Sequence, residues 1–543
     1  MTYLNSTIII KKKLRKKLFL MFKIWYCLIT LLYINQMNSL PTKRILQVMF
    51  PGGRTHNYVI KNLFNYTLHN EKIYNYEYYI VIHNIDTDTW KDLIEKFPKK
   101  VFVYGYGKKE IFKDMFGKSL DEMNKNPMFG FLNFNKGMKF NIKEFMESDI
   151  LKTLKNLNTN GDFFDIISTD VPNFIHKVIQ SELKIKKKMY LMPPVLPQTL
   201  YRNYELNPSY TPTIGSKYTN DMNFIERFLN FFVQTATKFM FFVFQTQQVK
   251  FLNSYGYNLD SVIHFPDSIN ILQFPLGIVF PISSPPNFIF LNTITSKPSE
   301  KIEDKKLDNF LNKYKKNVYV SQGTIMTSIS KEDLINIFKL FEKDNYGFIL
   351  SIRKEQMNDE EIKKLPENVF PTRWVDQNNL LGDSRIYLFV THGGFNSICE
   401  SVYHGKPMVV LGVGLDQFNT ASFIKKNEMG IVFQRNKFIN KENLKNAIFN
   451  VLNNEKYTLN TIRISSIIKD LKNPREEFQY WLNFVLKHGY DSLVIDTYFK
   501  SFSWIIVNGY DVAFAWFILI VFLCFLGKKL FSGKKKDKKI KIE

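Results

Sequence analysis

Residues 386–432 have the sequence IYLFVTHGGFNSICESVYHGKPMVVLGVGLDQFNTASFIKKNEMGIV. The first five residues are an unbroken apolar run, and residues 391–394 (THGG) follow it as a turn. A helix is predicted over 396–404, because Gly405 and Pro407 end its pattern before a second apolar run begins at 408. Apolar runs without alternation are typical of strands that are covered on both faces, so this stretch predicts a β–α–β unit of a parallel sheet.

The same alternation of strands and helices extends along the chain on both sides of this unit. In the second half, further strands are predicted over 317–321 and 348–352, and helices over 331–343 and 440–454. In the first half, strand-like runs occupy 45–50, 77–82, 163–168 and 288–291, with a helical pattern over 57–68. The polar stretch 296–306 is typical of a linker. We therefore predict an α/β protein of two Rossmann-like domains, 40–292 and 307–500, joined by a linker at 293–306 and facing each other across a cleft.

The turn at 391–394 has the features of an anion site. Adjacent glycines let backbone amides approach a ligand, and the unpaired amides at the start of the next helix favour a diphosphate. His392 adds a side-chain donor, and Asn396 and Ser397 open the helix. Glu400 shares a helix face with Ser397, where a carboxylate could accept hydrogen bonds from ribose hydroxyls. Asp416 and Gln417 follow the next strand and are suited to sugar hydroxyls.

Two residues of the first half could supply acid–base chemistry. His56 follows the first strand and Asp170 ends the strand near 164–169, so both are expected at the carboxyl edge of the sheet. Histidine titrates near neutral pH, and an aspartate bonded to its far ring nitrogen would fix the tautomer. The sequence also contains a D-x-D pattern at 86–88, which could bind a metal ion; we interpret it as capping of the following helix instead.

The donor-site segment closely resembles the signature of the UDP-glycosyltransferase family, which includes the UDP-glucuronosyltransferases. The resemblance spans nearly the whole chain and also covers residues 373–377 (RWVDQ), 379–382 (NLLG), 321–324 (SQGT) and 207–212 (NPSYTP). It implies a GT-B fold and inverting transfer of glucuronic acid or glucose from a UDP-sugar to a hydroxyl of a lipophilic small molecule, with no metal ion and no cofactor. The sequence departs from the family pattern at three places: Asp376 stands in place of proline, Gln322 in place of phenylalanine, and Thr293-Ile294 in place of a glycine-rich linker start.

The same resemblance implies roles for individual residues. Trp374 stacks on uracil and Gln377 bonds it, while Thr324, His392 and Ser397 contact the phosphates. Glu400 holds the ribose, and Asp416 and Gln417 hold the sugar. Gly394 and Asn396 complete the UDP-sugar site, and His56 and Asp170 are the catalytic base and its partner.

Composition limits the possible partners. Half of the formal net charge of +24 lies at the two ends, in 1–17 and 527–543, so the body has no concentrated basic stripe for nucleic acid. Of the three cysteines, only Cys399 lies in the body, which therefore has neither an internal disulfide nor a zinc-like cluster. The aromatic-rich stretch 224–244 is interpreted chiefly as core, with an acceptor pocket or a membrane contact as alternatives.

The two ends predict a membrane topology. Residues 1–39 have a basic start and an apolar run of about 11 residues, typical of a cleaved signal peptide, with an uncleaved anchor as the alternative. Residues 505–527 predict one transmembrane helix, followed by a Lys-rich cytoplasmic tail at 528–543. The last five residues, KIKIE, match a dilysine retrieval signal. These features predict a single-pass type I protein of the endoplasmic reticulum with a lumenal body.

Two other functions remain open on the sequence alone. The departures at Asp376 and Gln322 would suit a catalytically silent protein that only binds UDP. A transferase that acts on membrane lipids or proteins is the third hypothesis. A homo-oligomer is also left open, and the sequence does not determine the donor sugar or the acceptor.

Overall fold

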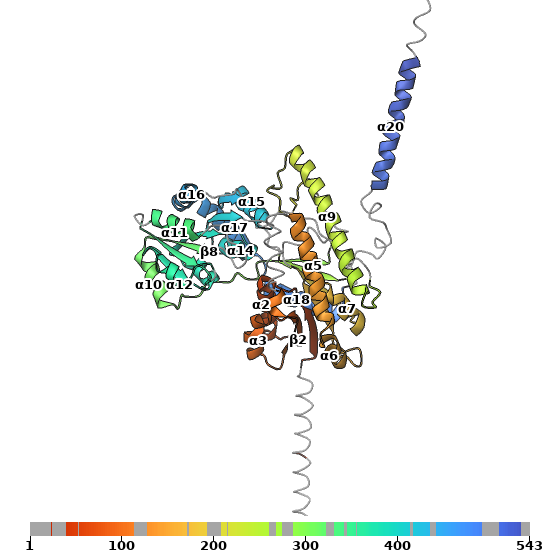
Figure 1. The fold of residues 1–543 in the computed structure, drawn as a ribbon, viewed down its shortest axis with the longest axis horizontal. Coiled ribbons are helices and arrows are strands. Elements are labelled where there is room, and N and C mark those ends of the chain that lie inside the picture. Colours follow the sequence, from red (N-terminus) through yellow and green to blue (C-terminus); the bar gives the residue numbers. More distant parts are fainter. Residues whose placement is uncertain are drawn as a thin grey trace, which may run out of the picture.

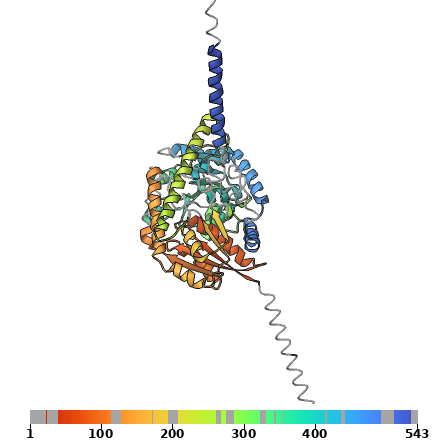
Figure 2. The ribbon, with the colours of Figure 1, turned by 90° about the vertical axis from the view of Figure 1, so that its right-hand side faces the viewer.

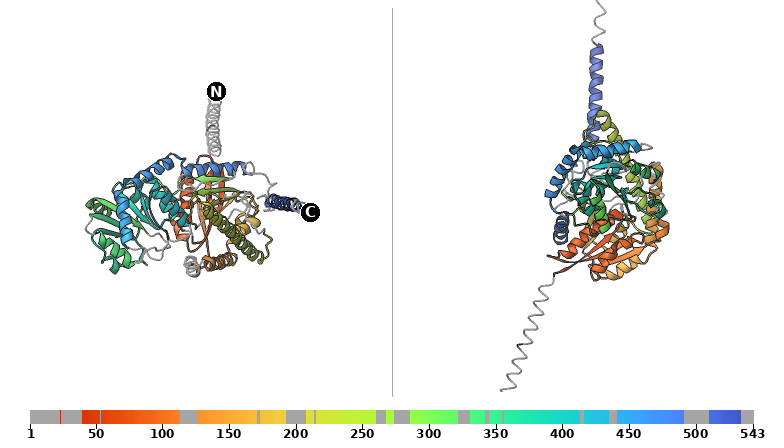
Figure 3. Two further views of the ribbon diagram at one scale, coloured as in Figure 1. Left: turned by 90° about the horizontal axis from the view of Figure 1, so that it is seen from above. Right: turned by 90° about the vertical axis from the view of Figure 1, so that its left-hand side faces the viewer.

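The computed structural model describes residues 23, 40–52, 54–112, 127–170, 173–192, 208–213, 215–259, 268–273, 286–321, 331–341, 345–354, 356–412, 416–434, 441–490 and 510–533. Two α/β lobes lie beside each other, each built on its own sheet (Figure 1). The view from above in Figure 3 shows the same two lobes side by side. The predicted pair of Rossmann-like domains is therefore confirmed.

The first lobe contains a seven-stranded sheet in the order β3-β2-β1-β4-β5-β6-β7, with every pairing parallel. Tyr78 and the residues after it in β2 are buried, as expected for a strand with helices on both faces. The strands are β1 (Thr42–Val48), β2 (Asn75–His83), β3 (Val101–Tyr106), β4 (Ile166–Asp170), β5 (Lys188–Met192), β6 (Ile269–Gln273) and β7 (Phe288–Leu291). The helices are α2 (Arg54–His69), the 3-10 helix η1 (Thr87–Trp90), α3 (Lys91–Lys96), α5 (Pro127–Met146), α6 (Ile150–Leu157), α7 (Ile175–Leu183) and α9 (Phe224–Asn253).

The second lobe contains a six-stranded parallel sheet in the order β10-β9-β8-β11-β12-β13. Its strands are β8 (Lys316–Ser321), β9 (Tyr346–Ser351), β10 (Val369–Thr372), β11 (Ile386–Thr391), β12 (Met408–Gly412) and β13 (Gly430–Gln434). Its helices are α10 (Lys305–Lys313), α11 (Lys331–Leu340), α12 (Asp359–Ile362), α13 (Gln377–Gly382), α14 (Phe395–Tyr403), α15 (Asp416–Lys426), α16 (Lys441–Asn453) and α17 (Glu455–Asp470). The predicted β–α–β unit is present as β11, α14 and β12.

The chain crosses between the lobes twice. Residues 293–296, at the start of the expected linker, are buried rather than solvent-exposed. Helix α18 (Pro474–His488), which lies within the predicted second domain, packs on the first lobe instead, with Phe478, Leu482 and Val485 in the same core cluster as β1 and β2. These two crossings hold the lobes together, and the linker lies close to the second lobe, where Thr295 bonds Glu400.

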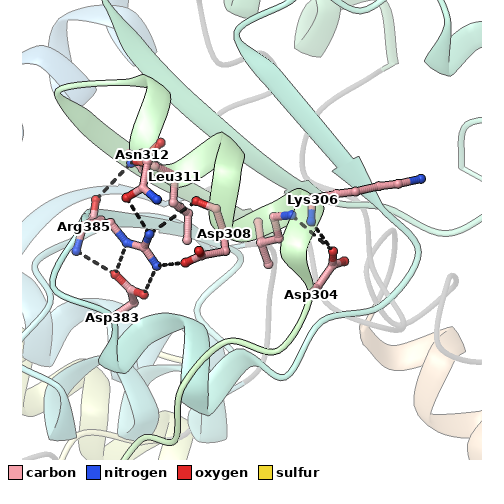
Figure 4. Close-up of polar contacts among 9 residues, drawn as sticks. Asp304, Lys306, Asp308, Leu311, Asn312, Asp383 and Arg385 are labelled. Carbon is pink, nitrogen blue, oxygen red and sulfur yellow. Dashed lines mark hydrogen bonds and ion pairs between the residues drawn. The ribbon is translucent and has the colours of Figure 1, made fainter.

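A charged cluster attaches α10 to the turn before β11 (Figure 4). The Arg385 guanidinium donates to both carboxylate oxygens of Asp383, at 2.9 and 2.6 Å, and pairs with Asp308 of α10 at 2.8 Å. Burial would raise the pKa of Asp383, but the bonds from Arg385 outweigh it and hold that pKa below its ordinary value. This cluster fixes the start of the strand that carries the turn at 391–394.

The two ends of the chain are described only in part. Helix α20 (Tyr510–Gly533) projects from the body, and its segment Tyr510–Lys529 is long and apolar enough to cross a membrane, with a mean hydropathy of 2.2 (Figure 2). The predicted signal segment, apart from Lys23, and the tail beyond residue 533 lie outside the described residues.

The expectation that 224–244 is chiefly core is wrong for most of that stretch. Phe224, Phe228 and Phe232 are 72%, 65% and 67% exposed, whereas Phe244 is fully buried. Helix α9 packs beside α5, and the first half of α9 extends beyond the end of that helix (Figure 1).

Candidate active site

The turn after β11 brings glycine backbone close to the start of α14. Gly393 has φ +87°, a left-handed conformation that favours glycine. Gly394 is the N-cap of α14 and has no side chain to bond the first amides of that helix. Thr420 of α15, which sequence reasoning missed, donates through its hydroxyl to the Gly393 carbonyl at 2.8 Å and so holds the turn in place.

His392 lies directly over this turn. A Cβ added at Gly394 would lie 2.5 Å from His392 Nε2, so only glycine leaves room for the imidazole. Burial lowers the pKa of His392 to about 4. The backbone of Ser321 raises this pKa, but by less than burial lowers it. Its buried Nδ1 has no partner that meets hydrogen-bond geometry. The ring is therefore neutral at physiological pH and can donate one N–H to an anion at the turn.

Gln377, Ser397 and Glu400, three predicted site residues, form one polar group. The Gln377 amide donates to Glu400 Oε2 at 2.7 Å and to Ser397 Oγ at 3.2 Å. Its carbonyl oxygen accepts from the Tyr319 hydroxyl at 3.2 Å, and Tyr319 was missed by the sequence analysis. Burial raises the pKa of Glu400 to about 7, while bonds from Gln377 and Thr295 oppose this shift. A carboxylate placed in this way can accept hydrogen bonds from a diol.

The unusual Asp376 has a structural explanation. Its carboxylate accepts from the Asn379 amide at 3.0 Å and so caps α13, the helix that begins at Gln377. The aspartate thus fixes the start of that helix through a hydrogen bond. Trp374, two residues earlier, is 78% exposed, which leaves a ring face accessible for stacking.

The remaining predicted donor residues are only partly described. Gln417 is buried, and its Cβ would lie 3.8 Å from a Cβ added at Gly393, so the start of α15 borders the turn. Asp416 is the first residue of α15, but its side chain lies outside the described part of the chain. Thr324 and Gln322 lie in 322–330, which is not described either.

His56 and Asp170 lie together at the carboxyl edge of the first sheet. His56 Nδ1 is 3.5 Å from Asp170 Oδ2, an ion-pair distance, although neither atom meets hydrogen-bond geometry. Asp170 is fully buried and its other oxygen accepts from the Phe50 amide, whereas 23% of the His56 side chain is exposed. Burial raises the pKa of Asp170, and His56 opposes that shift. Nδ1 thus faces the carboxylate, and the ring remains partly accessible.

Contacts between the lobes bring the elements that carry these two groups close together. Gln273, at the end of β6, donates to Asn396 Oδ1 of α14 at 3.0 Å. Tyr58 lies on α2 two residues after His56; burial raises its pKa, and the carboxylates of Glu400 and Asp376 add to that shift. The start of α2 therefore lies near Glu400. No sequence pattern pointed to Gln273, because its partner is 123 residues away.

The interpretation of the D-x-D pattern as a helix cap needs correction. Asp86 occupies the N-cap position of η1 but makes no side-chain capping bond. Instead its carboxylate accepts from the Gly52 amide at 2.6 Å and so fixes the turn that precedes His56. Asp88 pairs with Lys91 and Lys109. Among the described residues, no three His, Cys, Asp or Glu side chains are placed to share a metal ion.

Comparison with known proteins gives the family. The model of the family described as UDP-glucoronosyl and UDP-glucosyl transferase matches residues 45–539. The chain belongs to this family. The UDP-glucuronosyltransferase 3A1 of Bos taurus is 29% identical over 359 residues, which cover 63% of this chain and 65% of that protein. The 2-hydroxyacylsphingosine 1-beta-galactosyltransferase of Rattus norvegicus is 28% identical over 293 residues, 52% of each chain. The alignments thus span about half to two thirds of these relatives.

Solved structures agree on the fold of this transferase-family chain. The chain matches Os79 of O. sativa, solved with U2F and trichothecene, with a TM-score of 0.55 at 12% identity, covering 82% of this chain and 100% of that one. The calicheamicin glycosyltransferase CalG4 matches with a TM-score of 0.53 at 13% identity, covering 82% and 99%. At such low identity the likeness concerns the fold alone, and the predicted GT-B architecture is confirmed.

Proposed function

We propose that this chain transfers a sugar from a UDP-sugar to a hydroxyl of a lipophilic small molecule, with inversion at the anomeric carbon. The observation that supports the proposal is the His56–Asp170 pair at the carboxyl edge of the first sheet, together with the Gln273–Asn396 bond that joins this lobe to the helix after the glycine turn. The first lobe would bind the acceptor and the second the donor. Glucuronic acid and glucose are the proposed donor sugars.

His56 would act as the general base. Its Nδ1 faces Asp170, so Nε2 is the atom left to take the proton from the acceptor hydroxyl. As that O–H bond breaks, the oxygen attacks the anomeric carbon from the side opposite the leaving group. The bond from the anomeric carbon to the diphosphate oxygen breaks with its electron pair, and UDP departs. The resulting imidazolium lies 3.5 Å from a buried carboxylate that stabilises its charge.

The departing diphosphate would be stabilised at the turn after β11. The first amides of α14, the positive end of that helix and the His392 imidazole all lie there. Ser397 completes the phosphate contacts, Glu400 would hold the ribose hydroxyls, and Gln377 and Trp374 would hold uracil. These donors supply fixed positive potential, so we propose that the transfer needs neither a metal ion nor a cofactor.

The hypothesis of a catalytically silent protein rested on two departures from the family pattern, Asp376 and Gln322, and the structure removes the first of these arguments. Asp376 caps α13 and leaves Gln377 bonded to Glu400, so its presence is compatible with the nucleotide site that we propose. The lipid-acceptor hypothesis gains support from one relative, because the rat protein is named as a transferase that acts on 2-hydroxyacylsphingosine, a sphingolipid. A ceramide-type acceptor therefore belongs in any substrate screen.

We further propose that α20 anchors the protein in the membrane of the endoplasmic reticulum, with the body in the lumen. The apolar segment Tyr510–Lys529 and the Lys-rich residues after it support this orientation. Replacement of Lys539 and Lys541 by alanine should move the protein beyond the endoplasmic reticulum, as followed by immunofluorescence with organelle markers. Unchanged residence would contradict the retrieval signal.

The proposed activity is tested by a donor and acceptor screen. Full-length protein in nanodiscs would be incubated with UDP-glucuronic acid, UDP-glucose and UDP-galactose, together with phenolic or ceramide acceptors, and released UDP would be measured. We expect acceptor-dependent release of UDP with at least one donor. Tight UDP binding without release across the panel would instead support the silent protein.

A further inference from the structure

The first half of α9 exposes apolar side chains and buries polar ones. Its second half belongs to the core of the first lobe, where Phe244, Val249 and Leu252 are buried. In the first half the buried side chains are Asn230 and Gln234, four residues apart on one face of the helix. The Asn230 amide donates to the Pro208 and Thr211 carbonyls at 2.8 and 2.9 Å, which fixes this face against residues 208–213.

The outward face of the same segment carries large apolar side chains. Phe224, Ile225, Phe228, Phe231, Phe232 and Phe239 are all between 49% and 72% exposed. This polarity is the reverse of that expected for a helix on the surface of a protein in water, where apolar side chains turn inward. An outward apolar face is stable where it contacts hydrocarbon.

The length of the uncharged segment limits how it can meet a membrane. Residues 228–237 contain no charged side chain, with Arg227 before them and Lys238 after them. Ten helical residues extend about 15 Å, half of the hydrocarbon core of about 30 Å. This segment can therefore enter one leaflet but cannot span the bilayer.

The direction of α9 agrees with that of the proposed anchor. In Figures 1 and 2 the exposed end of α9 and helix α20 project from the same end of the molecule. In both views the tip of α9 reaches the level of the first turns of α20. A bilayer crossed by α20 would therefore lie against the tip of α9.

We propose that the first half of α9, residues 224–242, inserts its phenylalanine face into the leaflet that α20 enters. This segment is a second, monotopic membrane contact made by the first lobe, and the occupant of the exposed face is the lipid bilayer. The insertion does not depend on the transferase activity. Its consequence, that an acceptor dissolved in the bilayer reaches the first lobe directly, rests on the proposed function.

The insertion can be measured with a single fluorescent label. Full-length protein with Cys27→Ser and Cys524→Ser retains only the buried Cys399, and Phe228→Cys then accepts a nitrobenzoxadiazole label. The labelled protein is placed in phosphatidylcholine nanodiscs with or without lipids that carry a nitroxide at carbon 5. The matched control is Leu459→Cys, which replaces an apolar side chain of α17 that is 63% exposed.

We expect nitroxide lipids to lower the emission at position 228 at least twofold more than at position 459. Addition of Phe224→Asp and Phe232→Asp to the labelled protein should abolish that difference, whereas Leu459→Asp should leave it unchanged. Equal quenching at 228 and 459 would overturn the proposal. Nanodiscs that hold one copy and nanodiscs that hold two copies would also be compared. Loss of emission at position 228 only in nanodiscs with two copies would overturn the proposal, because the apolar face would then be a contact between copies. Neither readout requires turnover, so the result is independent of whether the proposed activity is present.

Discussion

The substitution Gly394→Ala tests the proposed phosphate site with little disturbance of the fold. The backbone at Gly394 has φ −60° and ψ 138°, which alanine adopts freely. The added Cβ would lie 2.5 Å from His392 Nε2 and 2.9 Å from its Cε1, whereas carbon contacts normally lie near 3.5–4.0 Å. The imidazole must therefore move by about 1 Å away from the turn.

The expected loss follows from the hydrogen bond that this movement breaks. A hydrogen bond to a charged phosphate contributes about 1.5–3 kcal/mol, so UDP should bind about ten- to 150-fold more weakly. Calorimetric titration with UDP measures this change. Gly412→Ala is the control in the same lobe, because a Cβ there meets its nearest atom at an ordinary 3.6 Å. Unchanged UDP affinity in Gly394→Ala, with a melting temperature equal to the control's, would refute the placement of the phosphates.

Two further predictions concern Glu400 and Arg385. The pKa of Glu400 rises to about 7 in the folded chain from about 4.3 in an unfolded one, so its ionisation destabilises the fold increasingly between those pH values. Glu400→Gln should therefore raise the free energy of unfolding by about 1–3 kcal/mol at pH 8 but leave it nearly unchanged at pH 4.5. Thermal melts at the two pH values measure this difference. An equal change in stability at both pH values would argue against the effect of the Glu400 charge. Arg385→Ala should lower that free energy by about 1–3 kcal/mol at neutral pH, because Asp383 and Asp308 lose their common partner; a melting temperature equal to the wild type's would contradict the importance of this cluster.

Local sequence patterns were sufficient to predict the fold and the turn of the candidate site. The apolar run of β11, the paired glycines and the helix that follows are encoded within residues 386–403, so the β–α unit could be predicted without tertiary information. His56 and Asp170 were predicted because both follow apolar strands, and carboxyl ends of parallel strands gather at one edge.

Residues that act through distant partners could not be predicted. Gln273 bonds Asn396 across 123 residues, and Thr420 holds the Gly393 carbonyl from another helix. Helix α18 has an ordinary amphipathic sequence that does not reveal which lobe it covers. Asp86 has the sequence context of a helix cap, but its carboxylate bonds an amide 34 residues earlier.

The orientation of α9 was misjudged although a signal for it was present. Its many phenylalanines suggested a core helix by composition alone. Two polar residues among them, Asn230 and Gln234, are spaced to share one face, and this face is the buried one. A helix rich in apolar residues therefore needs its polar stripe examined before it is assigned to the core.

The central claim is that a nucleotide bound at the turn after β11 faces the imidazole of His56. The most direct measurement compares UDP affinity and turnover in His56→Ala with those of the wild type, using a donor and acceptor that the wild type consumes. We predict a UDP dissociation constant within about threefold of the wild type's and a turnover number lower by at least about a hundredfold. Turnover within a few fold of the wild type's would contradict the claim.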